Sequence, residues 1–143
     1  MAFRDFRFPD VQGELGLTLT ETNLFESVVP SKLPTEFTER MRSGIELALA
    51  VNTEKARSEF IIAPVLLELR RQLPGQFGLF SGIEFDVDAS RGLNGFCDFI
   101  LTRSPLQSVM TAPLVAIVEA KNDNLRSGLG QCIAAMVAAR EFN

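Results

Sequence analysis

The apolar run Leu114–Val118, followed directly by an acid and a base, limits what this chain can fold into more than any other feature. A short run of Leu, Val, Ala and Ile predicts a buried strand, and Glu119 and Lys121 stand at its end. Side chains alternate across a strand, so Glu119 and Lys121 should share one face, with Ala120 on the other. Such a pair can hold a metal ion and a phosphate or a water. The alternative is a solvated ion pair, which is common and weak.

A second expected strand, residues 95–102, carries one acid among apolar neighbours. An isolated carboxylate in an apolar strand is costly unless it is paired or bound to a metal. Asp98 is therefore a candidate ligand. The alternatives are that it caps a bulge or pairs with Arg103.

The remaining patterns predict helices before and after three strands. The predicted helices cover about 36–51 and 54–73 and begin again near Leu125; the predicted strands cover 80–87, 95–102 and 114–121. Pro64 should kink or split the second helix near Ala63, because proline removes a backbone hydrogen bond. Residues 15–19 could form a short strand or an extended arm. The apolar stripe of the last helix should include Leu129, Cys132, Ile133, Met136 and Val137.

Length and composition favour one domain over residues 1–143, with an N-terminal arm and helix (1–52) and a core (53–143). The absence of histidine excludes imidazole-ligated zinc and Ser-His or Cys-His catalysis. A net charge of -4 argues against a strongly basic nucleic-acid surface, although a local basic groove remains compatible with it. No apolar run reaches the length of a membrane span, and charges at Arg4, Asp5 and Arg7 do not fit a secretion signal. We therefore expect no membrane association and a reducing cytoplasm.

Asp98 in one strand, then Glu119-x-Lys121 after the next, resembles the motif of the PD-(D/E)xK, or restriction-endonuclease-like, nuclease superfamily. The resemblance covers about residues 53–143. It implies an α/β fold in which a mixed sheet is flanked by helices, with a common core of helix, three strands, helix and strand. The terminal strand is not recognisable here. Either the chain is a fragment, or a second copy or another partner covers that sheet edge.

The resemblance also implies a metal site that uses oxygen ligands. Asp98, Glu119 and the backbone carbonyl of Ala120 would bind Mg²⁺ or Mn²⁺. Lys121 would orient or activate water, or offset charge on the phosphate.

Two helical residues complete the expected site. Glu59 matches a glutamate that many family members carry on the helix before the strands, although its spacing from Lys55 also permits a surface ion pair. Gln131 resembles the Gln of the Gln-x-x-x-Tyr motif in an exonuclease branch of the superfamily. In this chain the position of the Tyr is occupied by Ala135. It could contact a phosphate oxygen, or be a polar residue at the edge of its helix. Both side chains are expected to face the same cleft as Asp98.

The function expected from these residues is divalent-metal-dependent hydrolysis of DNA. One alternative is a catalytically inactive nuclease-like scaffold that binds nucleic acid or a protein. Another is a small α/β interaction module whose acids are structural, since a fold does not fix a function.

Overall fold

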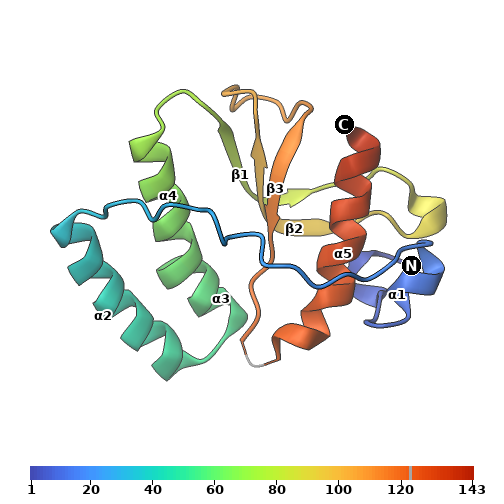
Figure 1. Cartoon of the computed structure of the whole chain (residues 1–143), viewed down its shortest axis with the longest axis horizontal. Helices are drawn as coiled ribbons and strands as arrows, with labels where there is room; N and C mark the ends of the chain where they lie inside the picture. The colour runs from blue at the N-terminus through green and yellow to red at the C-terminus, as the bar shows by residue number, and fades with distance from the viewer. Residues whose placement is uncertain (123) are drawn as a thin grey trace.

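The computed structural model describes residues 1–122 and 124–143 and has an α/β architecture (Figure 1). A small sheet lies between α4 (Ala63–Gln72) on one side and α5 (Leu125–Phe142) on the other. The predicted α/β class is confirmed.

The sheet contains β1 (Gly78–Glu84), β2 (Phe96–Thr102) and β3 (Leu114–Val118), in the order β1-β2-β3. Both pairings are antiparallel, so for the described residues the expectation of a mixed sheet is wrong. Each strand reverses direction to pair with the next, and a parallel pair would need a longer crossover. The first and third strands also end three residues earlier than predicted. Glu119, Ala120 and Lys121 therefore follow β3 instead of closing it.

The helix predicted over 54–73 is present but interrupted. It consists of α3 (Glu54–Arg57), a π-helical turn η2 (Ser58–Ile62) and α4. The Thr53 side chain caps the start by accepting the Ala56 N–H at 3.0 Å. The wider turn comes directly before Ala63 and Pro64, where proline supplies no donor. The irregularity lies where the sequence predicted it, but Ile62 and Ala63 keep helical dihedrals, so the helix is not split. Helix α2 (Thr35–Val51) packs against α3 and η2.

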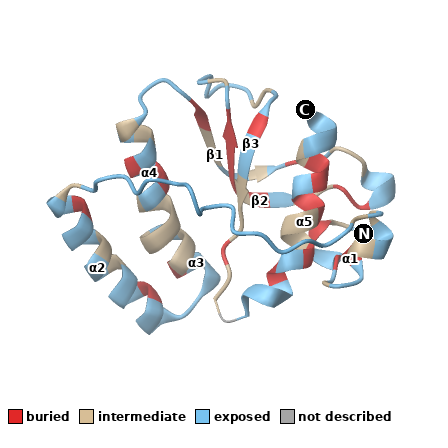
Figure 2. Cartoon of the chain, viewed as in Figure 1, coloured by how far each residue is buried: buried red, intermediate tan, exposed pale blue. Residues whose placement is uncertain are grey.

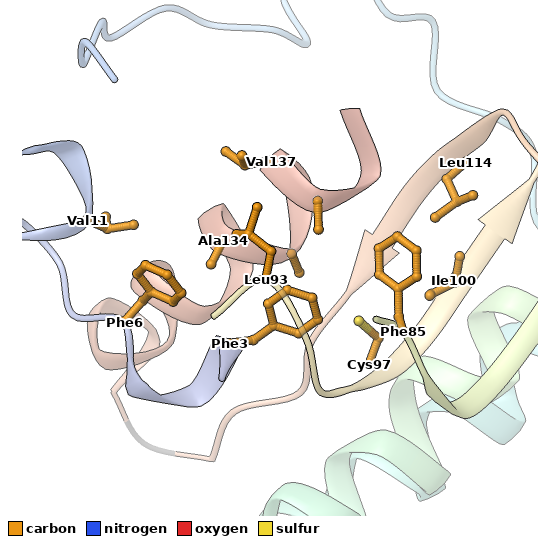
Figure 3. Close-up of a cluster of buried hydrophobic side chains, with 12 residues drawn as sticks. Phe3, Phe6, Val11, Phe85, Leu93, Cys97, Ile100, Leu114, Ala134 and Val137 are labelled. Atoms are coloured by element: carbon orange, nitrogen blue, oxygen red, sulfur yellow. The ribbon is translucent and has the colours of Figure 1, made fainter. Parts of the chain in front are cut away.

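The first residues of the chain belong to the main core. Phe3, in the helical turn η1 (Phe3–Asp5), packs with Phe6 and with Val11, which opens α1 (Val11–Glu14), against α5 and the sheet (Figure 3). Residues 15–19 form no strand; the chain from 18 to 33 is exposed and runs on to α2. The side chains of residues 15–19 alternate in hydropathy, but this segment pairs with none of the three strands of the described sheet.

A second, smaller core lies between α4 and the other face of the sheet, where Leu66 meets Phe77, Phe99 and Leu101. Burial is concentrated in the sheet and along α5, whereas α2 is largely exposed (Figure 2). Strand β2 is thus covered on both faces, and it carries Asp98 between the two cores.

The buried face of α5 matches the predicted stripe only in part: Val137 is buried and Ile133 packs against the core. Leu129 and Met136 are 41% and 58% exposed. The buried positions are instead mostly small residues: Gly128, Gly130, Ala134, Ala135, Val137 and Ala138. A Cβ at Gly130 would lie 2.7 Å from the carbonyl carbon of Phe6. Small residues are buried here because the N-terminal segment approaches the helix backbone closely.

Candidate functional site

Asp98 connects β2 to the chain that follows β3. Phe99 pairs with Val118, so Asp98 lies opposite the start of the Glu119–Lys121 segment. Its Oδ2 accepts the Ala120 N–H at 2.7 Å, whereas Arg103, its alternative partner, lies beyond the far end of β2. Ala120 is buried and joins the site through its amide. The ligand role predicted for its carbonyl oxygen stays a prediction.

Glu119 is a half-buried carboxylate with one oxygen unsatisfied. Gln131 Nε2 donates to Oε2 at 2.9 Å. Oε1 is buried and has no hydrogen-bond partner among the described residues. Burial, followed by the neighbouring charge of Asp98, raises the pKa of Glu119 to about 7; the Cys97 thiol, Lys121 and the Asp98 backbone oppose this rise but are weaker. A buried acceptor without a partner is uncommon and calls for a physical explanation.

Lys121 is anchored at both ends of its side chain. Its stem lies against α5, where a Cβ at Gly128 would come within 2.8 Å of the lysine Cγ. Its ammonium lies 3.3 Å from Oε1 of Glu54, at the start of α3. The charge of Lys121 still acts on Glu119, because it lowers the pKa of that carboxyl. The sequence did not suggest Glu54, since the two partners are 67 residues apart.

Glu59 and Asp98 line one hollow of about 480 Å³ between the π-helical turn and the sheet. Its other walls include Glu54, Lys55, Ser58, Ser81, Gly82 and Ala120. Glu59 is also 2.8 Å from Lys55 Nζ, with its side chain 52% exposed. The predicted cleft and the alternative ion pair are therefore both present, and the catalytic role of Glu59 stays a prediction.

Gln131 reaches the site from another side. It lies on α5 and lines a second hollow of about 450 Å³ together with Arg4, Asn94 and Phe96. The expectation that Gln131 lines the hollow of Asp98 is therefore not met. It contacts Glu119 instead, because α5 packs on the other side of the sheet from α4.

Comparisons with protein-family models, with curated proteins and with solved structures find no match to this chain. The likeness to the nuclease superfamily accordingly rests on the residues described above. Over the described residues, no helix is long and apolar enough to cross a membrane.

The two carboxylates of the site could bind a metal ion, but side chains alone would not complete its coordination. Among residues 1–122 and 124–143, no three Asp, Glu or Cys side chains are grouped closely enough to hold a cation. A cation at Asp98 and Glu119 would need further oxygens from backbone or water. Magnesium suits such a site, because it commonly keeps several waters and uses one or two carboxylates.

Proposed function

We propose that this chain is a divalent-metal-dependent nuclease that hydrolyses phosphodiester bonds of DNA, with Mg²⁺ or Mn²⁺ held at Asp98 and Glu119. The observation that carries the proposal is the buried, unsatisfied Oε1 of Glu119 beside the carboxylate of Asp98. A shared cation would satisfy that oxygen and offset the repulsion that raises the pKa of Glu119. Buried charges are usually paired or coordinate metals.

The residues of the chain have separate roles in this proposal. A bound divalent ion would neutralise the phosphate and lower the pKa of its water. Asp98 is oriented by the Ala120 amide, and Glu119 by the Gln131 amide. Lys121 would leave its ion pair with Glu54 and contact the scissile phosphate. Its charge would there stabilise mainly the transition state. Glu59, on the facing wall of the hollow, would hold a water or a hydrated cation.

A second candidate is a catalytically inactive nuclease-like scaffold that binds nucleic acid or a protein. Two contacts favour it: Lys121 already pairs with Glu54, and Glu59 with Lys55. Both predicted catalytic groups would have to leave these partners. The overall charge of -4 disfavours tight binding to a polyanion, which counts against DNA as the partner in either candidate.

The expected partner at the sheet edge and the expected compartment also remain proposals. Strand β3 is an edge of the described sheet, where Val115 is 51% exposed and Asn143 bonds both the N–H and the carbonyl of Leu114. A second copy or another chain could extend the sheet there. Cys97 and Cys132 are both free thiols, in keeping with a reducing cytoplasm.

Metal binding and cleavage test the main proposal together. Calorimetric titration with Mn²⁺ should show binding to the wild type and its loss in Asp98→Ala. Lys121→Ala should bind Mn²⁺ as tightly or more tightly, because it removes a nearby positive charge. Its cleavage of plasmid or single-stranded DNA should fall by roughly 10²- to 10³-fold, the effect typical of removing one group that stabilises a transition state.

Asp98→Ala, purified in parallel, is the control for contaminating nuclease. No Mn²⁺ binding by the wild type would refute the metal site. Equal cleavage by the wild type and Lys121→Ala would refute the role of Lys121. DNA binding without metal-dependent cleavage would favour the scaffold.

A further inference from the structure

An exposed aromatic ring stands next to the candidate site. Phe96 opens β2, two residues before Asp98, and is 65% exposed, although Phe85 and Phe99 nearby are buried. A single exposed apolar residue is ordinary on a protein surface. Phe96 differs because it lines the hollow of about 450 Å³ that also holds Arg4, Asn94 and Gln131.

This hollow has both apolar and polar walls, and the charges on its walls balance. Arg4 and Glu84 contribute opposite charges to its walls. Asn94 Oδ1 is buried without a hydrogen-bond partner among the described residues. The backbone N–H of Phe3 donates to the Asn94 carbonyl at 2.8 Å, which fixes one wall. Gly95 keeps that wall close, since its φ is 142° and a Cβ there would lie 3.3 Å from the Phe3 ring.

The hollow is joined to the candidate metal site in two ways. Gln131 lines it and donates to Glu119. Phe96 pairs with Glu84 across β1 and β2, while Gly82 and Asp98, two residues further along the same strands, line the other hollow. Two residues of strand span about 6.6 Å, so the two hollows lie near one end of the sheet, one on the side of α3 and the other on the side of α5.

We propose that this hollow binds an unpaired base of single-stranded DNA, stacked on Phe96, while the adjoining phosphate lies toward Asp98 and Glu119. The proposal deepens the nuclease function and rests on it for the role of that phosphate. A base has a flat face for the ring and polar edges for Arg4, Glu84 and the Asn94 amide. A base paired inside a duplex presents no free face, so the site selects single strands.

The charge of the chain agrees with this mode of binding. A net charge of -4 argues against binding that depends chiefly on phosphate contacts. Stacking gives affinity that does not require a basic surface, and it tolerates any base sequence.

The test is binding without cleavage. Fluorescence anisotropy in EDTA would measure the affinity of the whole chain for a labelled single-stranded oligodeoxynucleotide of about 12 nucleotides and for the same sequence as a duplex. Phe96→Ala should weaken single-strand binding roughly 5- to 150-fold, the range typical of losing one base–aromatic stack. Phe96→Trp should keep the wild-type affinity or improve it. Phe25→Ala is the matched control, because Phe25 is 75% exposed but lies in the connecting segment.

Each outcome decides the matter. Wild type that fails to bind the single strand, or prefers the duplex, overturns the proposal, as does equal single-strand affinity for the wild type and Phe96→Ala. An equal loss in Phe25→Ala would also overturn it, by showing that any exposed ring contributes. Circular dichroism melts confirm that the variants are folded. Stacking on Phe96 without metal-dependent cleavage would uphold the base site and refute the nuclease. Duplex cleavage without single-strand binding would uphold the nuclease and refute the base site.

Discussion

Glu119 combines partial burial, a hydrogen bond from Gln131 and a neighbouring carboxylate, and its protonation should affect stability. The pKa of Glu119 is about 7 in the folded protein against an ordinary value of 4.5. The folded state therefore holds this proton more tightly than the unfolded state. Its contribution to stability is complete below about pH 4.5 and is lost as pH rises to about 7. The upper limit is about 3 kcal/mol, which solvent at the partly exposed side chain reduces.

Replacing this carboxyl should remove that dependence. In EDTA, we expect the wild type to lose up to about 2 kcal/mol relative to Glu119→Gln between pH 5 and pH 8. Glutamine keeps an oxygen for Gln131 but cannot ionise. Urea unfolding at several pH values measures the difference, and Mn²⁺ at pH 8 should stabilise the wild type selectively. Parallel pH profiles for the two proteins would show that Glu119 does not titrate in this way.

Some site residues could be found from sequence and others could not, for a physical reason. Asp98 and Glu119 were identifiable because an acid within or directly after an apolar strand is unusual, and the sequence alone shows it. The contacts of Lys121 with Glu54 and of Gln131 with Glu119 depend on how helices pack on the sheet. Phe96 gave no signal either, because a phenylalanine in a strand ordinarily predicts burial.

At the scale of elements, α5 depends on close backbone approach more than on large apolar side chains. Its Gly130 faces the N-terminal segment, where a Cβ would lie 2.7 Å from the Phe6 carbonyl carbon and 2.9 Å from that of Arg7. Backbone atoms cannot move aside as a flexible side chain can. The same helix carries Gln131, so its approach to the core also sets the contact with Glu119.

This packing predicts opposite effects for two glycine substitutions in helices. Gly130→Ala should destabilise the protein by about 1–3 kcal/mol, because overpacking outweighs the gain of about 1 kcal/mol in helix propensity. Gly13→Ala is the control, since nothing lies within 4 Å of a Cβ there, and it should be neutral or slightly stabilising. Chemical denaturation measures both. A tolerated Gly130→Ala would mean that the N-terminal segment does not hold this position against α5.

The elements themselves were largely predictable where local chemistry sets their ends. The predicted helix start at residue 54 is the start of α3, and Pro64 marked the place of the wider turn in that helix. The face of α5 was mispredicted at Leu129 and Met136. Its small buried residues were missed because glycine and alanine add little to an apolar stripe, although they permit the closest contacts. The sheet was misjudged because parallel pairing came from the family resemblance and not from any pattern in the chain.

At the scale of the whole molecule, the N-terminal segment is structurally continuous with the core that the sequence placed at 53–143. Phe3, Phe6 and Val11 are 1%, 2% and 0% exposed within one cluster that includes Ile100 and Ala134 (Figure 3). Irregular sequence with Gly and Pro predicted an arm there. Its aromatic residues are nevertheless buried, because the small residues on one face of α5 allow them to pack closely against that helix.

Loss of one of these rings should therefore destabilise the whole chain. Phe6→Ala should lower the free energy of unfolding by about 3–5 kcal/mol, the usual cost of emptying a buried aromatic site, which is a large part of the 5–15 kcal/mol typical of a domain. Phe25→Ala should change it by less than about 0.5 kcal/mol, since that ring is 75% exposed. Urea unfolding followed by circular dichroism should give one cooperative transition for both variants, shifted in Phe6→Ala alone. A Phe6→Ala protein as stable as Phe25→Ala would show that the first residues do not belong to the core, and α5 would then have to be held against the sheet without them.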